Sequence, residues 1–267
     1  MLNNDFSGIV TLTTDFGQED GYAGTMKGVI LNQAPQTCIV DISHNIPAFN
    51  LRQAFIVLNA AFVYFPKGTI HVMIVDPGVG SSRRHILVHA AGHYFIGPDN
   101  GVLGRIAKLH NGQTWAMDFT SIGITSASST FHGRDVYAVA AGKILNLGYR
   151  QLVTGFIDPV LLALPEPVKT KTGFDGEILY IDNFGNLVSN LRKEHLTNNS
   201  TLVIKDAIVP IVEYYSQLDF TAPGALLNSW GYIEICVKEA QASLMLGVTI
   251  GEKISIVNSN ITEEKKK

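Results

Sequence analysis

The chain has 267 residues, of which 46% are hydrophobic and 16% are charged, and its mean hydropathy is +0.18. This composition is rich enough in apolar side chains for a sizeable core and argues against a disordered chain. The formal net charge of -3 gives no sign of a surface for nucleic-acid phosphates, and no apolar run is long enough to span a membrane.

Strands and helices alternate in the first part of the sequence. A β-branched run predicts a strand at residues 8–14, and an apolar face at helical spacing predicts a helix at residues 22–33. The further elements expected there are strands at 38–42 and 70–75, helices at 51–65 and 136–147, a short helix from residue 102, and a hairpin with strands at 85–90 and 94–96. This alternation predicts an α/β fold with a mostly parallel central sheet covered by helices on both faces.

The pattern changes near residue 165, where Pro, Lys and Thr gather as they do in linkers. We therefore expect an N-terminal α/β domain at residues 1–165, a linker at 166–173 and a C-terminal domain at 174–267. Short strand candidates without a long helical period follow the linker at 176–181, 201–204, 207–212, 225–227, 232–237 and 253–257. They predict a smaller all-β domain, either a barrel or a sandwich.

Four loops in the first domain carry unusual polar content: residues 15–20, 76–84, 99–100 and 132–135. Three of them follow predicted strands, and ligands of α/β proteins bind where strands end. Asp76 ends the apolar run at 70–75 and precedes Pro77, which cannot continue a central strand. Asp76 and Arg83 are thus candidates for a site, although a turn-capping Asp and a solvated Arg explain the same residues.

The sequence lacks the motifs that several enzyme classes require. Residues 15–17 read Asp-Phe-Gly, but no other kinase motif accompanies them, and neither a Walker A sequence nor a Gly-x-Gly-x-x-Gly run precedes the first helix. Asp15, Asp20 and Asp76 keep a Mg²⁺ site open as an alternative. The spacing of five histidines is not that of metal ligands, so surface or strand positions are expected for His44, His85, His89, His93 and His110.

The two cysteines, Cys38 and Cys236, lie in apolar strand-like runs and are expected to be small core residues in a reducing compartment. No basic start followed by an apolar core precedes Ile9, so no signal peptide is expected. Together these features predict a cytoplasmic protein.

Six motifs follow one another along the chain. They are Thr-Thr-Asp-Phe-Gly at 13–17, Val-Asp-Pro-Gly-Val-Gly at 75–80 with Arg83, Gly-Pro-Asp-Asn-Gly at 97–101, Phe-His-Gly-Arg-Asp at 131–135, Asp-Asn-Phe-Gly-Asn at 182–186 and Asn-Ser-Trp-Gly-Tyr at 228–232. Each motif is weak alone, but the ordered set covers nearly the whole chain and is specific. In this order the motifs resemble those of the S-adenosylmethionine (SAM) hydroxide adenosyltransferases, or SAM hydrolases, which are related to the SAM-dependent fluorinase and chlorinase.

The resemblance implies an α/β domain and a small β-barrel, assembled as a homotrimer that binds SAM between the N-domain of one subunit and the C-domain of its neighbour. It implies SAM as the substrate, with no other cofactor and no metal. Asp76, Arg83 and His132 match the residues that handle the attacking water. The substrate-binding positions that it implies are Asp15 at the ribose, Asp20 and Asp182 near the methionine ammonium, Phe184 and Asn186 around the adenine and methionine, Ser229 at the methionine, and Tyr22, Phe49 and Val79.

The implied reaction is a nucleophilic substitution at the ribose 5′-carbon, which gives adenosine and L-methionine. Because methionine leaves from a sulfonium, the site needs an oriented water more than an acid. Asp76 is expected to orient or deprotonate that water, Arg83 to fix the carboxylate, and His132 to orient the water or accept its proton. A halogenase, a non-catalytic SAM or adenosine sensor and a metal-dependent hydrolase remain alternatives; an anionic side chain at the attacking position disfavours the halogenase.

Overall fold

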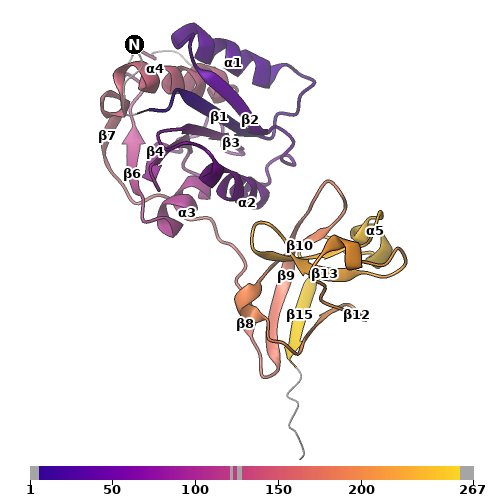
Figure 1. Ribbon diagram of the computed structural model, residues 1–267. Helices are drawn as coiled ribbons and strands as arrows, with labels where there is room; N and C mark the ends of the chain where they lie inside the picture. The colour runs from indigo at the N-terminus through magenta and orange to yellow at the C-terminus, as the bar shows by residue number, and fades with distance from the viewer. Residues whose placement is uncertain (1–5, 121–122, 125–127, 259–267) are drawn as a thin grey trace, which may run out of the picture. The chain divides into compact units, whose positions relative to one another are not determined.

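Figure 1 shows the computed structural model of the chain, which describes residues 6–120, 123–124 and 128–258. The chain divides into two compact units, Met1–Ala163 and Leu164–Lys267, and each is described here by itself. Within the described ranges, no helix combines the length and the apolar content needed to cross a membrane.

The first unit is built on a seven-stranded sheet with the order β2-β1-β3-β5-β4-β6-β7. Its strands are β1 (Ile9–Thr14), β2 (Cys38–Ser43), β3 (Ile70–Ile74), β4 (His85–Ala90), β5 (His93–Pro98), β6 (Gln113–Met117) and β7 (Val153–Phe156). Strands β2, β1, β3 and β5 pair in parallel, whereas the pairs β5-β4, β4-β6 and β6-β7 are antiparallel.

The prediction of a mostly parallel sheet was only partly right, since three of the six strand pairs are antiparallel. Only two residues separate β4 from β5, and such a short turn can join only antiparallel strands. The hairpin itself was expected from the sequence and is confirmed. Strands β6 and β7 were not predicted, because both are short and mix polar with apolar residues.

Helices cover both faces of this sheet, as the alternating pattern predicted (Figure 1). They are α1 (Tyr22–Gln33), α2 (Leu51–Ala61), α3 (Val102–Leu109) and α4 (Val139–Leu147). Helix α1 packs with α4 on one face, and α2 packs with α3 on the other. A π-helical turn, η3 (Gly133–Ala138), leads directly into α4 and begins next to His132.

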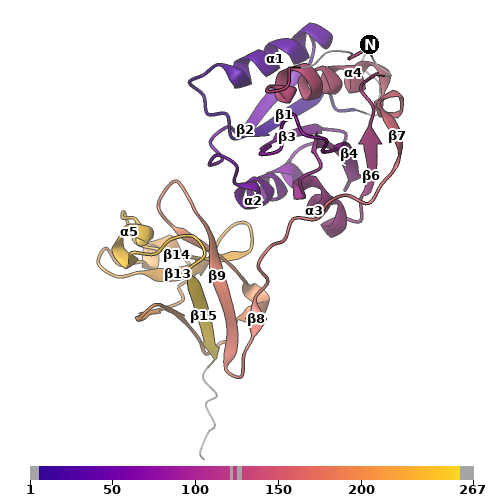
Figure 2. The same cartoon turned by 180° about the vertical axis from the view of Figure 1, so that it is seen from behind.

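The second unit holds a nearly closed barrel, seen from behind in Figure 2. Its strands follow the order β12-β11-β15-β9-β10-β14-β13, with β8 paired to β9. Their bounds are β8 (Val168–Lys169), β9 (Gly173–Ile181), β10 (Leu187–Arg192), β11 (Ser200–Ile204), β12 (Ala207–Val209), β13 (Gly224–Leu227), β14 (Tyr232–Cys236) and β15 (Lys253–Asn258). The segment after β12 bonds to β13, because the Val212 N–H donates to the Ala225 carbonyl at 2.8 Å and the Ala225 N–H to the Pro210 carbonyl at 2.8 Å.

The six strands expected in this unit are all present, and their hydrogen bonds favour the barrel over the sandwich. The description as all-β was incomplete, since a short helix, α5 (Ala242–Leu246), precedes β15. Strand β10 was not predicted, and β8 begins within the expected linker.

Two expectations about single residue types need correction. Cys38 is exposed because it begins β2, which is an edge strand of its sheet, whereas Cys236 is buried as expected; both thiols are free. His44 lies after β2 and is buried, where its Nδ1 is 2.7 Å from the Thr14 hydroxyl, so the expected surface position was wrong. His89 and His93 do lie in strands, as expected.

His71 is a fully buried histidine on the face of β3 that packs beneath α2 and α3. Its Nδ1 is 2.7 Å from the Thr11 hydroxyl, and its Nε2 is 3.2 Å from Nδ1 of His93. Burial, followed by the charge that His93 would carry, lowers the pKa of His71 to about 3. The imidazole is therefore neutral in the folded protein across the physiological range.

This buried histidine predicts a loss of stability in acid. As pH falls below about 6.5, His71 binds a proton in the unfolded chain, whereas in the folded protein it stays neutral down to about pH 3. Between pH 7 and pH 5 this difference lowers the free energy of unfolding by about 2 kcal/mol. We expect His71→Gln to reduce the difference in unfolding free energy between pH 7 and pH 5 by about that amount. Urea unfolding of a Trp230→Phe background, in which Trp115 reports on the first unit, measures it; an unchanged difference contradicts the assignment.

Candidate active site

Strand topology brings the polar loops of the first unit to one edge of the sheet. Strands β1, β3 and β5 are parallel, so their carboxyl ends meet at that edge, and antiparallel β4 starts there. The chain runs from β1 to β2 on one side and returns to β3 on the other, which makes β1 and β3 a topological switch point, the usual ligand position in such sheets. Asp15 follows β1 and Asp76 follows β3.

Asp76 and Arg83 form a two-pronged ion pair at this edge. Arg83 Nε donates to Asp76 Oδ1 at 2.7 Å, and Arg83 Nη2 donates to Asp76 Oδ2. The side chains are only 6% and 9% exposed. Burying either charge alone is costly, so each residue depends on the other for its position. A solvated Arg83 is thereby ruled out.

His132 joins this pair through Arg83. Arg83 Nη2 donates to His132 Nδ1 at 3.0 Å, although the two residues are 49 positions apart. A guanidinium has no acceptor, so His132 Nδ1 carries no proton and neutral His132 keeps its proton on Nε2. Burial and the Arg83 charge lower the pKa of His132, against the opposing effects of Asp76 and Asp135. His132 is therefore neutral at pH 7.

A cavity of about 440 Å³ opens beside these residues. This volume is within the range of small-molecule sites. Seven residues predicted from the sequence line it: Asp15, Asp20, Tyr22, Phe49, Asp76, Val79 and His132. Arg83 reaches it through Asp76 and His132.

Residues that the sequence analysis did not single out also line this cavity. Phe16 and Phe131 pack with Tyr22 as an aromatic cluster, with ring centroids 5.0–5.8 Å apart. Thr130, Ala48, Ile74 and Gly133 complete the lining. Their position in the sequence could have identified the two Phe residues, because Phe16 directly follows Asp15 and Phe131 directly precedes His132.

Asp15 also shapes the cavity through the backbone of Phe49. Its Oδ2 accepts a hydrogen bond from the Phe49 N–H at 2.9 Å, and Phe49 has the left-handed φ of 64° while its side chain is largely exposed. Such strain in a non-glycine residue is typical of ligand sites. The carboxylate keeps Oδ1 available for a ligand.

The loop at residues 99–100 reaches the same sheet edge but serves the fold. Asp99 accepts from Arg84 Nε at 2.8 Å and from the Val160 N–H at 2.9 Å. Asn100 donates to the Val75 carbonyl at 2.7 Å. These bonds fix the end of β3 just before Asp76.

The alternative of a Mg²⁺ site finds no matching geometry in the part of the chain that the structure describes. Within it, no group of three or more His, Cys, Asp or Glu side chains is arranged to hold a metal ion. Asp76, one of the three carboxylates considered, faces Arg83 instead.

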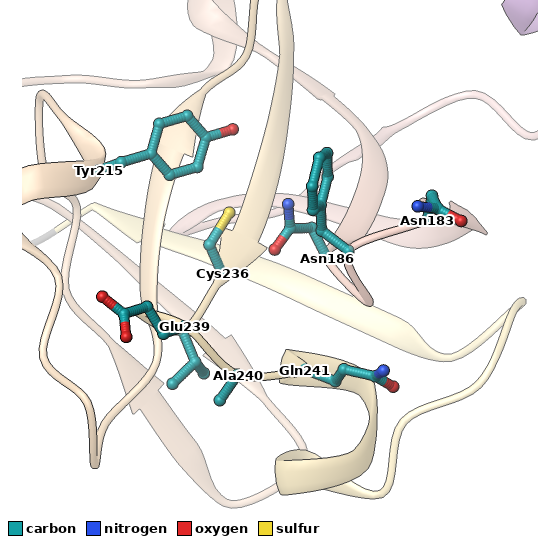
Figure 3. A pocket seen from close by; sticks show the side chains of 9 residues that line it. Asn183, Asn186, Tyr215, Cys236, Glu239, Ala240 and Gln241 are labelled. Atoms are coloured by element: carbon teal, nitrogen blue, oxygen red, sulfur yellow. The ribbon is translucent and has the colours of Figure 1, made fainter.

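The second unit has a cavity of its own, of about 530 Å³ (Figure 3). The predicted residues Phe184 and Asn186 line it, together with Asn183, Tyr215, Cys236, Val237, Glu239, Ala240 and Gln241. Figure 3 shows the side chains of Tyr215, Cys236 and Asn186 around one space, and Glu239, Ala240 and Gln241 following one another along its rim. The Phe184 side chain is 73% exposed, so one face of its ring is free to stack.

Asp182 and Ser229, also predicted for the site, do not line this cavity. The Asp182 carboxylate is used within its own loop, since Oδ1 accepts from the N–H groups of Phe184 and Asn186, both at 2.9 Å, and Oδ2 accepts from Asn186 Nδ2 at 3.0 Å. Asp182 thus holds the loop and orients the Asn186 amide. Ser229 is exposed between β13 and β14.

Comparison with known proteins gives matches over nearly the whole chain. Residues 10–151 match the family model of the SAM hydroxide adenosyltransferase N-terminal domain, and residues 176–255 match that of its C-terminal domain. An (R)-S-adenosyl-L-methionine hydrolase of Methanocaldococcus jannaschii is 35% identical, over 96% of this chain and 98% of that protein. A fluorinase of an Actinoplanes species is 22% identical, over 94% of this chain and 98% of its own length. The crystal structure of an uncharacterized conserved protein from Thermotoga maritima superposes with a TM-score of 0.86 at 28% identity, covering 94% of this chain and all of that one.

The conformation of Gly80 predicts that the Asp76 loop depends on a close contact with Ser129. Its φ is +80°, and a Cβ there would lie 2.5 Å from the Ser129 carbonyl oxygen, so the loop rests on the segment that leads to His132. We expect Gly80→Ala to destabilise the first unit by about 1–3 kcal/mol. Gly24→Ala is the control, since it lies in α1 with open space around it and is expected to stabilise the helix by about 0.5–1 kcal/mol. Urea unfolding followed at Trp115 compares them, and an unchanged Gly80 variant would show that the loop does not depend on this contact.

Proposed function

The chain belongs to the SAM hydroxide adenosyltransferase family, and from the arrangement of Asp76, Arg83 and His132 we infer how it carries out the family's reaction. It is an enzyme that hydrolyses S-adenosyl-L-methionine to adenosine and L-methionine. The observation that carries the assignment of roles is the buried Asp76–Arg83 pair with His132 attached, beside a cavity that also holds Asp15.

The reaction makes simple demands on the site. The water oxygen bonds to the ribose 5′-carbon, the bond from that carbon to sulfur breaks with its electrons going to sulfur, and one water proton leaves. Methionine departs as a neutral thioether and needs no proton. The water must therefore be held in line with the breaking bond, which is the kind of positioning that contributes most in such reactions.

We assign Asp76 as the group that orients the water and accepts its proton. Each of its oxygens accepts from Arg83 and keeps a second lone pair that can face the water. Pairing with Arg83 makes the carboxylate a weak base. A weak base suffices here, because the water becomes strongly acidic once its oxygen starts to bond to carbon.

His132 has the complementary role. Because Nδ1 accepts from Arg83, the neutral ring presents Nε2–H, which donates and does not accept. His132 therefore orients the water or a ribose oxygen, and Asp76 is the better candidate for the proton.

The remaining predicted residues bind the substrate in this proposal. Asp15 Oδ1 accepts from the ribose hydroxyls, and Asp20 attracts the methionine ammonium. The aromatic cluster of Phe16, Tyr22 and Phe131 gives the sulfonium a dry, electron-rich wall.

The cavity of the second unit suits the adenine. The exposed Phe184 ring offers a stacking face, and Asn186 Oδ1 is an acceptor for the exocyclic amine because its Nδ2 is already used by Asp182. Asp182 acts by orienting Asn186, and Ser229 is proposed as a methionine contact. No cofactor besides the substrate enters the proposal. An exposed free thiol at Cys38 supports a reducing, cytoplasmic setting.

Incubation of the pure protein with SAM tests the function directly. Equal amounts of adenosine and methionine are expected, whether or not EDTA is present. With added fluoride or chloride no 5′-halogenated adenosine is expected, since the Asp76 carboxylate repels an anion at the attacking position. Binding of SAM without products would point to the sensor alternative.

Asp76 and Asp15 should differ in their kinetic effects. Asp76→Asn keeps the side-chain size but removes the charge, and we expect kcat to fall roughly 10²–10⁴-fold with little change in SAM affinity. Asp15→Asn is expected to weaken SAM binding as well, because it removes a ground-state contact. Single-turnover kinetics and calorimetric binding measure both, and more than half of the wild-type rate in the Asp76 variant would exclude its role at the water.

We also propose that the active enzyme is a homotrimer in which the first unit of one subunit and the second unit of its neighbour form each site. The support is the division of the predicted ligand groups, with Asp15 to His132 in one compact unit and Asp182 to Ser229 in the other, each unit having its own cavity. The boundary between the domains is proposed to lie at residues 166–173.

Subunit mixing tests this arrangement. Asp76→Asn and Asn186→Ala subunits are inactive or weak alone, but a mixed trimer would contain sites built from the intact half of each, so co-expression should restore part of the activity. Asp76→Asn with Arg83→Ala is the matched control, because both defects lie in the first unit. Light scattering should give a trimer at micromolar protein; a fully active monomer, or mixing without recovery, would contradict the proposal.

A further inference from the structure

Arg83 has a third contact that the proposed mechanism does not use. Its Nε and Nη2 face Asp76, and Nη2 also reaches His132, which leaves Nη1. Nη1 lies 3.5 Å from both ring nitrogens of His85, the first residue of β4. Equal distances to the two nitrogens mean that the guanidinium rests against the ring and not on one lone pair.

The His85 ring is itself fixed by neighbouring side chains. Its Nδ1 is 2.7 Å from the hydroxyl of Tyr137, which lies in the π-helical turn η3 and is fully buried. Phe119 packs edge-on against the same ring, with centroids 4.9 Å apart, and the His132 ring lies 5.3 Å away. The His85 ring is thus held by Tyr137, Phe119 and His132.

Both members of this pair are uncharged. Burial, then the charge of Arg83 and the charge that His132 would carry if protonated, lowers the pKa of His85 to about 4, and burial raises the pKa of Tyr137 well above its usual value. An uncharged ring can contact the guanidinium without repelling it. A π-helical turn is a frequent feature of functional sites, and here Tyr137 lies within the turn while His132 directly precedes it.

We propose that His85 and Tyr137 are positioning residues for the hydrolysis of SAM. The Tyr137 hydroxyl fixes the His85 ring, the ring supports Arg83, and Arg83 then holds Asp76 and His132 in the arrangement that handles the water. This inference rests on the proposed function of that site, but the contact of Arg83 with His132 can be measured without turnover.

Tyr137→Phe tests the proposal, because it removes one oxygen and keeps the ring in the core. In the full-length protein we expect kcat to fall on the order of 10-fold, since small misplacements of reacting groups cost rates of this size, with KM within about 2-fold. His85→Phe removes the ring nitrogen that contacts the Tyr137 hydroxyl and should lower kcat by a similar factor. His89→Gln is the matched control, because His89 lies on the same strand but stacks on Tyr94, away from the site, and it should keep the wild-type kcat.

A second readout separates positioning from a general loss of structure. The Arg83 charge lowers the pKa of His132, so release of Arg83 in Tyr137→Phe should raise that pKa, measured by proton NMR of the imidazole with thermal melting as a check of folding. Wild-type kcat and an unchanged His132 titration in both variants would overturn the proposal. If the wild-type protein fails to hydrolyse SAM, the proposed function is wrong, while the titration still decides whether His85 and Tyr137 position Arg83.

Discussion

The site is organised by the ion pair between Asp76 and Arg83. Both side chains are almost fully buried, and a buried charge is tolerated only with a partner of good geometry. Arg83 supplies that geometry with two parallel hydrogen bonds; its Nη2 also reaches His132, and its Nη1 contacts His85. A single guanidinium thereby links the end of β3, the start of β4 and the entry to α4.

The fold provides what this pair requires. Parallel β1 and β3 end side by side at a switch point, which brings Asp15 and Asp76 into the lining of one cavity. Strand β4 runs antiparallel to β5 and therefore begins at the same edge, where Arg83, just before it, pairs with Asp76 and where His85, its first residue, contacts Arg83. The departure from a parallel sheet is therefore part of how the site is assembled.

The cavities of the two units are lined by different kinds of side chain. The first is lined by charged groups, among them Asp15, Asp20 and Asp76, whereas the second has an exposed aromatic ring, Phe184, and an oriented amide, Asn186. Asp182 shows how a predicted ligand can act through another residue, because its carboxylate is used by its own loop.

The sequence by itself determined the local features. Apolar periodicity predicted the main helices of the first unit, and β-branched runs predicted most strands in both. The six ordered motifs predicted the family, and the resemblance implied seven of the residues that line the first cavity. Their physical basis is short-range, since a strand end, a turn and a run of motif residues are all readable within a few positions. Only the tertiary structure decided that Arg83 reaches His132 and that Tyr137 contacts His85, because these pairs are 49 and 52 positions apart and meet through the packing of separate elements. It also decided how Asp182 is used, because the carboxylate turns to its own loop. It also corrected Cys38, whose exposure follows from the edge position of β2, a property of strand order that no local pattern carries.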